Sequence, residues 1–334
     1  MKAAQIEKYD KNNIKVNIVK KEKPTITKNE LLIKVVAAGV NPVDNMISRG
    51  EVRMIVAYKL PIISGNEFVG IVEKMGEQVS KFNIGDRVFA RMPLNKIGTF
   101  SEYISVEEEA LAKVPEYLTS IEAAAIPLTA LTIMQALELM GIEKGKTIFI
   151  SGGTGSVGAM AIPIAKAKGL TVITNGSVES RDRVLALGAE KFIDYMTEDY
   201  TKILKNIDYV LDTLGGKETE KQMSILKKGG KLVSLRAMPN GSFAKRMNLP
   251  KWKQILLTIA GSKFDKMAAK YGVTYDFIYV ESNGKQLQEV AEIFEKLRIK
   301  PSIDTVFSFD RINDALYKVE NGRSKGKTVI SMEQ

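Results

Sequence analysis

One glycine-rich segment has the residue types and the spacing of a phosphate-binding loop. Residues 153–158 read Gly-Thr-Gly-Ser-Val-Gly, which fits G-x-G-x-x-G, and they directly follow the apolar run at 148–150. In a dinucleotide-binding turn a strand precedes this loop and a helix follows it, so that N–H groups at the helix N-terminus meet the phosphates. Gly153 and Gly155 then permit the tight turn and the close approach of the backbone, and Gly158 permits helix and strand to pack closely. The segment predicts phosphate binding; a glycine turn without a ligand is the alternative.

The next segment indicates which dinucleotide binds. An NAD site usually carries Asp or Glu about 20 residues after the glycines, where the carboxylate holds the ribose hydroxyls. Here the run at 171–174 is followed by Asn175, Ser177 and Arg181, without an acid at its end. A hydroxyl and a guanidinium suit a 2′-phosphate, so the pattern predicts NADPH as the cofactor. Arg181 as an ordinary solvated helix residue is the alternative.

The sequence contains neither cysteine nor histidine. Disulfides, thiolate nucleophiles and histidine-based general bases are therefore excluded. Zinc sites use Cys or His almost without exception, so we expect no metal site. Without a metal, alcohol oxidation lacks the Lewis acid that stabilises an alkoxide, whereas hydride donation to an electron-poor carbon needs less help. The composition thus favours reduction of an activated acceptor.

The elements that must position these residues change in character along the chain. The first third reads as strands and turns, with strands expected at 31–36, 68–72 and 86–90. From about residue 121, helical and apolar runs alternate, which is typical of a parallel, doubly wound sheet. From residue 301 the pattern returns to strands around one short helix at 312–319. The fold class expected is α/β, with a β-rich domain and a Rossmann domain.

Length and charge set broader limits. The chain has 334 residues, enough for two domains, and a formal net charge of +10 that favours anionic partners. Its lysines are scattered, so a solvated surface is the simpler interpretation. We expect no membrane span, because no apolar run of about 18 residues stands out, and the N-terminal residues lack a signal pattern. The expected location is cytoplasmic.

Short motifs along nearly the whole chain resemble the medium-chain dehydrogenase/reductase superfamily. They are Gly-Val-Asn-Pro-Val-Asp at 39–44, Gly-Asn-Glu-Phe-Val-Gly at 65–70, Gly-Asp-Arg-Val at 85–88, Gly-Thr-Phe-Ser-Glu-Tyr at 98–103, Pro-Leu-Thr-Ala-Leu-Thr at 127–132, Leu-Gly-Ala at 187–189, Leu-Asp-Thr-Leu-Gly-Gly at 211–216 and Gly-Lys at 326–327. Their order and spacing are most similar to the zinc-free quinone oxidoreductase (zeta-crystallin-like) branch. Zinc-dependent relatives carry His where this chain has Asn66, and they carry a four-cysteine lobe where only residues 91–97 lie here.

The resemblance implies an architecture of two domains. A GroES-like catalytic domain would comprise residues 1–124 and 299–334, and an NADP-binding Rossmann domain would comprise residues 125–298. It also implies cofactor contacts at matching positions. These are Thr129 near the nicotinamide, Gly155, Ser156 and Val157 at the pyrophosphate, Asn175, Ser177, Arg181 and Tyr195 around the 2′-phosphate, Thr213, Leu214, Gly215, Ser234 and Leu235 along the ribose and adenine, Phe277 and Ile278 beside the nicotinamide, and Arg323 and Lys325 near the chain end. For Phe277, packing in the core is an equal alternative.

The activity that the resemblance implies is transfer of hydride from NADPH to a quinone or an α,β-unsaturated carbonyl. Asn41 would hydrogen-bond the carbonyl of this electrophilic substrate, and Tyr58 is a weaker candidate donor. Formation of the turn before Pro42 is the alternative role of Asn41. Family members often carry Tyr or Lys where this chain has Met46, so no proton donor is assigned there.

One basic amphipathic stretch, residues 243–270, holds the only tryptophan. Basic amphipathic stretches lie on anionic membranes or touch nucleic acid. This gives an alternative function, an NADPH-binding protein that acts through one of those partners. A helical cover over the substrate or a subunit contact in a homodimer is the simpler interpretation.

Overall fold

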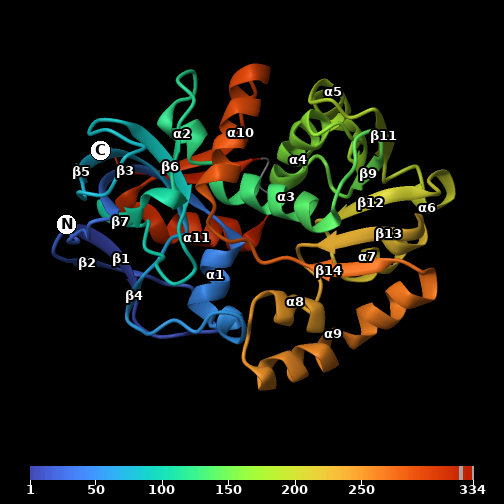
Figure 1. Ribbon diagram of the computed structural model, residues 1–334, viewed down its shortest axis with the longest axis horizontal. Coiled ribbons are helices and arrows are strands. Elements are labelled where there is room, and N and C mark those ends of the chain that lie inside the picture. The colour runs from blue at the N-terminus through green and yellow to red at the C-terminus, as the bar shows by residue number, and fades with distance from the viewer. Residues whose placement is uncertain (323–325, 333–334) are drawn as a thin grey trace. The chain divides into compact units, whose positions relative to one another are not determined.

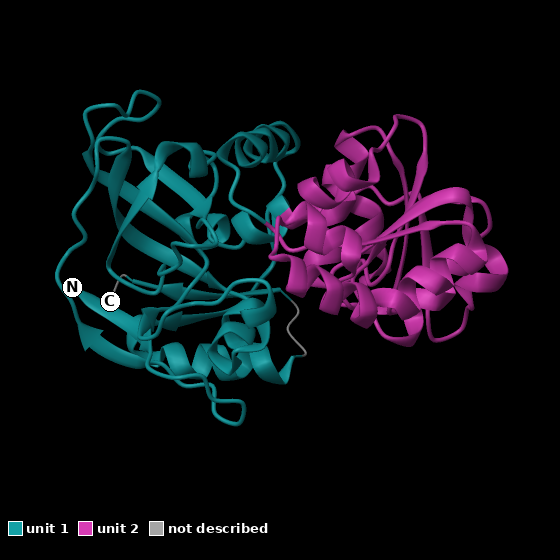
Figure 2. Ribbon diagram, turned by 60° about the horizontal axis from the view of Figure 1, so that its bottom comes forward, with its two compact units in different colours: residues 1–131, 281–334 teal, residues 132–280 magenta. Residues whose placement is uncertain are grey.

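The computed structural model describes residues 1–322 and 326–332. The chain divides into two compact units, one formed by residues 1–131 and 281–334 and the other by residues 132–280 (Figure 2). The first unit thus contains both chain ends, with the second inserted between them in sequence. We describe each unit by itself.

The first unit is β-rich. Its larger sheet has the order β15-β16-β3-β5-β6-β8, and β7 pairs with β3. The strands are β3 (Glu30–Val40), β5 (Glu67–Met75), β6 (Arg87–Arg91), β7 (Tyr103–Glu107), β8 (Ala112–Lys113), β15 (Ile303–Ser308) and β16 (Lys327–Ser331), and a smaller sheet joins β1 (Lys2–Ile6), β2 (Asn17–Lys20) and β4 (Ile62–Ile63). The antiparallel pairing of β16 with β3 brings the last strand of the chain beside one of the first. The β-rich GroES-like domain expected from the sequence is confirmed.

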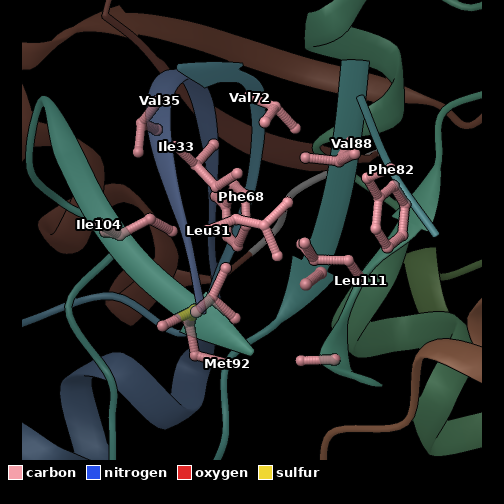
Figure 3. Close-up of a cluster of buried hydrophobic side chains, with 13 residues drawn as sticks. Leu31, Ile33, Val35, Phe68, Val72, Phe82, Val88, Met92, Ile104 and Leu111 are labelled. Atoms are coloured by element: carbon pink, nitrogen blue, oxygen red, sulfur yellow. The ribbon is translucent and has the colours of Figure 1, made fainter. Parts of the chain in front are cut away.

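The core of this unit lies between the strands of the larger sheet. Leu31 and Ile33 from β3, Phe68 from β5 and Val88 from β6 pack together there (Figure 3). In β3 the cluster takes Leu31, Ile33 and Val35, which are alternate positions, so these side chains lie on the same face of the strand. The packing fixes the register of β3 against β5, and therefore the position of the residues that follow β3 and precede β5.

Short helices complete the first unit. They are α1 (Pro42–Arg49), α2 (Ser120–Ala123), α10 (Gly284–Leu297) and α11 (Ile312–Asn321), with 3-10 turns at Glu51–Met54, Glu108–Ala110 and Phe309–Arg311. Pro42 occupies the first turn of α1, where its missing N–H costs no hydrogen bond. Helix α10 packs against β8 and the turn at Glu108–Ala110. Residues 281–298 therefore lie with the first unit, whereas the sequence analysis placed them in the Rossmann domain.

The second unit is a six-stranded sheet, parallel throughout, in the order β11-β10-β9-β12-β13-β14 (Figure 1). Its strands are β9 (Thr147–Ile150), β10 (Thr171–Gly176), β11 (Lys191–Asp194), β12 (Ile207–Asp212), β13 (Leu226–Ser234) and β14 (Thr274–Phe277), and its helices are α4 (Ser156–Ala167), α5 (Arg181–Ala186), α6 (Tyr200–Ile203), α7 (Lys217–Ser224), α8 (Gly241–Arg246) and α9 (Lys251–Tyr271), with a 3-10 turn at Val178–Ser180. This strand order is that of a doubly wound dinucleotide-binding fold, in which the order reverses beside the first strand, here between β9 and β12. The expected Rossmann domain is confirmed.

Helix α3 (Pro127–Met140) links the two units in sequence. Together with α2 it gives residues 120–140 the length and hydropathy of a membrane span, contrary to the expectation that no such run exists. Because 72% of its most apolar 18-residue stretch is buried inside the protein, the segment has the character of a core helix.

Candidate functional site

The glycine loop between β9 and α4 leaves little space on its inner side. A Cβ on Gly153 would lie 1.9 Å from Oγ1 of Thr174, whose hydroxyl donates to the carbonyl of Ile150. A Cβ on Gly158 would lie 2.4 Å from the carbonyl oxygen of Gly152. These two glycines are therefore required by packing inside the second unit, independently of any ligand.

Gly155 differs, because its side-chain direction is open. It precedes the first residue of α4 with φ −77° and ψ 171°, and a Cβ there would meet only the carbonyl oxygen of Gly152 at 3.4 Å. Gly155 and Ser156 are exposed, and no side chain caps the first N–H groups of α4 in the described structure. A helix N-terminus with unpaired N–H groups and an approach free of side-chain atoms fits a pyrophosphate. The site thus has the cradle that a dinucleotide needs.

Two side chains hold this loop in place. Oδ1 of Asn175 accepts from the N–H of Gly152 at 2.8 Å, and the Asn175 carbonyl accepts from the N–H of Gly153 at 3.0 Å. The guanidinium of Arg183 donates to the carbonyl of Thr154 at 2.6 Å. Asn175 is buried, and its side-chain oxygen supports the loop. A contact of its amide nitrogen with a 2′-phosphate stays a prediction. The loop-supporting role of Arg183 was not foreseen, although its place in the helix after β10 could have suggested it.

The other candidates for the 2′-phosphate lie at the ends of two paired strands. Gly176 of β10 is opposite Asp194 of β11, so that Ser177 and Tyr195 directly follow neighbouring strand ends. The N–H of Tyr195 donates to the carbonyl of Gly176 at 3.2 Å, and the Tyr195 side chain is exposed. Arg181 begins α5 nearby in sequence and is also exposed. The structure thus places a hydroxyl, a phenol and an exposed guanidinium in segments that follow β10 and β11.

A buried carboxylate organises the loop after β12. Asp212 Oδ1 accepts from the N–H of Gly215 at 2.8 Å and from that of Leu214 at 3.1 Å. Its Oδ2 accepts from the hydroxyls of Thr219 and Ser234 at 2.7 and 2.8 Å. The Asp212 carbonyl accepts from the N–H of Leu235. Asp212 was not among the predicted site residues, and its position at a strand end was the one available signal.

The hydroxyls expected along the ribose have partners within the protein. Ser234 is fully buried and donates to Asp212, so its hydroxyl shapes the loop, and its contact with the cofactor stays a prediction. Thr213 Oγ1 donates to the carbonyl of Ser151 at 2.6 Å. Leu214 is exposed and Gly215 has φ +71°, a conformation that favours glycine. The exposed surface of this loop is therefore apolar.

The predicted nicotinamide contacts from the second unit are buried. The ring of Phe277 packs edge-on against Phe243, with centroids 5.2 Å apart, and Ile278 donates its N–H to the carbonyl of Ser234. Phe277 thus packs in the core of this unit, and its contact with the nicotinamide stays a prediction. Arg323 and Lys325 lie outside the described residues, and their contacts stay predictions.

In the first unit, Asn41 belongs to a buried polar network. Its Nδ2 donates to Oε1 of Glu67 at 2.7 Å and, at the limiting distance of 3.5 Å, to the carbonyl of Gly39. Its Oδ1 accepts from Nζ of Lys327 at 2.6 Å, and Lys327 also pairs with Glu67 at 2.5 Å. Oε2 of Glu67 accepts from the N–H of Leu128 in the first turn of α3. Asn41 therefore has structural partners on both sides of its amide, a role that exceeds the turn expected before Pro42.

Asp44 extends the network to Asn66. Its Oδ2 accepts from the N–H of Asn41 and its Oδ1 from Nδ2 of Asn66, both at 2.7 Å. Burial raises the pKa of Asp44 to about 7, and the negative charge of Glu67 adds to the rise. The described residues contain no group of three Cys, His, Asp or Glu side chains placed to hold a metal. With amides at positions 41 and 66, the network does not offer the ligands that zinc prefers.

The two remaining candidates of the first unit lie in buried positions. Thr129 lies in the first turn of α3 and is 5% exposed. Tyr58 follows the 3-10 turn at Glu51–Met54, is 9% exposed, and its carbonyl accepts from the hydroxyl of Tyr9 at 2.8 Å. Lys327 was noted only as part of a motif, because nothing in the sequence links it to Asn41.

Comparison with known proteins agrees with this geometry. A family model described as "Alcohol dehydrogenase GroES-like domain" matches residues 27–116, and one described as "Zinc-binding dehydrogenase" matches residues 187–330. The chain is 33% identical to the NAD(P)H oxidoreductase RTN4IP1, mitochondrial, of Danio rerio, with 99% of this chain and 91% of that protein aligned. It is 32% identical to the 2-methylene-furan-3-one reductase of Solanum lycopersicum, over 92% of this chain and 73% of that protein.

Among solved structures, a quinone oxidoreductase from Coxiella burnetii matches with a TM-score of 0.82 at 28% identity, covering 100% of this chain and 99% of the other. The zebrafish relative is mitochondrial by name, so the cytoplasmic expectation gains no support from these comparisons.

Proposed function

This chain belongs to the zinc-free branch of the medium-chain dehydrogenase/reductase superfamily, and we propose that it is an NADPH-dependent reductase of quinones or α,β-unsaturated carbonyls. Its relatives make it an oxidoreductase that uses a nicotinamide cofactor. The choice of NADPH and the class of acceptor are the parts that we propose.

The observation that carries the proposal is the open cradle at Gly155 at the N-terminus of α4. The backbone N–H groups of Ser156 and Val157 would hold the pyrophosphate, since the helix dipole favours negative charge there. Arg181, Ser177 and Tyr195 follow β10 and β11, where an NAD site would carry an acid, and they supply a cation and hydroxyls for a 2′-phosphate. The preference for NADPH rests on these three side chains.

The acceptor class follows from the side chains available for chemistry. Bound NADPH supplies the hydride, and the protein supplies position and electrostatics. Because the sequence has no Cys or His, we propose a carbon made electron-poor by conjugation as the acceptor. The hydrogen bond from Nδ2 of Asn41 to the carbonyl of Gly39 is long, at 3.5 Å, so breaking it costs little. We propose that this N–H donates to the substrate carbonyl instead. Tyr58 stays the second candidate donor.

The test is an acceptor screen with the purified chain. We expect NADPH oxidation with a quinone or an enone, and no comparable oxidation of simple alcohols with NADP⁺. Asn41→Ala should lower kcat by more than it weakens NADPH binding. Retained NADPH binding also shows that the variant is folded. Tyr58→Phe tests the second donor without changing the volume of the ring. Tight NADPH binding with no turnover across quinones, enones and alkenals would contradict the proposed reaction.

A further inference from the structure

An apolar stripe remains exposed on helix α9 of the second unit. Trp252, Ile255, Leu256 and Ile259 are 56, 62, 48 and 66% exposed. Their spacing of three, four and seven residues places them on one face of the helix. The buried face of α9 uses other residues, Leu257, Gly261 and Ala268. Figure 1 shows α8 and α9 on the side of β14, the edge strand of the sheet.

The charged residues next to the stripe in sequence are basic, and the first acid after it in α9, Asp265, accepts from Asn240. Residues 242–264 include five basic side chains and no Asp or Glu. Among them, Arg246 pairs with Asp276 of the same unit. Lys251 and Lys253 flank Trp252, and the Lys253 ammonium lies 5.6 Å from the centre of the indole ring. The stripe is therefore bordered by positive charge at the end that carries the tryptophan.

This combination discriminates between three occupants. A two-fold contact between copies of this chain that paired the stripe with itself would bring two strongly basic segments together, which is unfavourable. Nucleic acid would pair with the lysines but offers no apolar layer for Ile255 and Ile259. An anionic bilayer offers both, because acidic headgroups attract the lysines and the acyl boundary accepts the aliphatic and indole side chains.

We propose that the exposed face of α9 docks on an anionic lipid bilayer, with the helix axis in the plane of the interface. Trp252 and the three aliphatic side chains enter the headgroup and acyl boundary, and Lys251 and Lys253 lie among the acidic headgroups. Two signals of moderate strength act together, so binding is reversible and sensitive to salt. The proposal does not rest on the reductase activity, since none of these residues was assigned to the cofactor or the substrate.

The single tryptophan of the chain makes the test direct, because its fluorescence reports on the proposed face alone. The full chain is mixed with vesicles of phosphatidylcholine, with or without phosphatidylglycerol. We expect co-sedimentation with the anionic vesicles only, a shift of tryptophan emission to shorter wavelength, quenching by brominated lipid, and release at high salt. The double variants Ile255→Ser with Ile259→Ser and Lys251→Glu with Lys253→Glu should each weaken binding at least tenfold.

Two control variants on other surfaces distinguish binding through this face from nonspecific hydrophobic adsorption and from an effect of net charge. Ile84→Ser removes an equally exposed isoleucine of the first unit, and Lys20→Glu with Lys21→Glu makes the same change of net charge at another surface. Both should bind vesicles like the unaltered chain. The proposal is overturned if emission does not shift, or if the controls lose binding equally. It is also overturned if the Ile255 and Ile259 changes dissociate a dimer in light scattering, or if the lysine pair governs RNA binding while vesicles are ignored.

Discussion

Gly155→Ala separates the ligand from the fold, because the structure leaves room for a methyl group at this position. The backbone angles of Gly155 suit any residue, and the new Cβ would meet only one oxygen, at 3.4 Å. Alanine is a poorer residue than glycine before a helix, by about 0.5–1 kcal/mol. It also reduces the freedom of the unfolded chain, which stabilises by about 0.4–1 kcal/mol. These effects nearly cancel, so the midpoint of urea unfolding should not move.

Binding of NADPH should respond strongly to the same methyl group. It would stand between the pyrophosphate and the first N–H groups of α4, at the cost of one charge-assisted hydrogen bond, worth about 1.5–3 kcal/mol. The dissociation constant should therefore rise about 10- to 150-fold, measured by calorimetry or by NADPH fluorescence. As a contrast, Gly176→Ala places a Cβ 2.1 Å from Cγ2 of Thr154 and should destabilise the second unit itself. Unchanged affinity in a stable Gly155→Ala protein would refute the assignment of this loop.

Four further outcomes test the rest of the site. Lys327→Met removes the ammonium that pairs with the buried Glu67, and it should lower the free energy of unfolding in urea by about 3–5 kcal/mol. Adding Glu67→Gln should recover most of this loss. A double variant as unstable as the single one would contradict the pairing. The pKa of Asp44 is about 7 in the folded protein and about 4 in the unfolded chain, so this group lowers the free energy of unfolding as pH rises from 4 to 7. Asp44→Asn should flatten that slope. An unchanged slope would show that another group causes it. The unaltered chain should bind NADPH at least tenfold more tightly than NADH, and Arg181→Ala should erase most of the difference in fluorescence titrations; equal affinities at the outset would rule out the assigned 2′-phosphate site. Turnover should survive exhaustive chelation, since the sequence has no Cys or His, and restoration by zinc of an activity lost to a chelator would be the contrary result.

The parts that the sequence predicted well are local in the chain. The strand, the glycine loop and the helix occupy 21 consecutive positions from Thr147 to Ala167, and their order alone indicates a phosphate-binding turn. The existence of strands in the first unit followed from apolar runs separated by glycine-containing turns. Their ends did not: the strands expected at 31–36 and 68–72 continue to Val40 and Met75.

What could not be predicted is which polar side chains the fold itself consumes. Asn175 and Ser234 stand at strand ends, where one accepts from the N–H of Gly152 and the other donates to Asp212. A motif gives the position of a hydroxyl or an amide but not the direction of its hydrogen bond. Long-range pairing was equally hidden, because Lys327 and Asn41 meet only after β16 has paired with β3, across 286 residues of sequence.

The polar network of the first unit buries more negative than positive groups. Asp44 and Glu67 bring two fully buried carboxyl groups, and Lys327 supplies the ammonium that pairs with one of them. A second buried negative charge is costly, so Asp44 retains a proton near neutral pH, as its raised pKa indicates. Histidine is the side chain that ordinarily titrates near pH 7, and in this chain, which has none, the Asp44 carboxyl has a pKa in that range. A change of turnover near pH 7 should therefore be compared with Asp44→Asn before it is attributed to the substrate, since Asp44 accepts from the backbone of Asn41, the residue proposed to hold the substrate carbonyl.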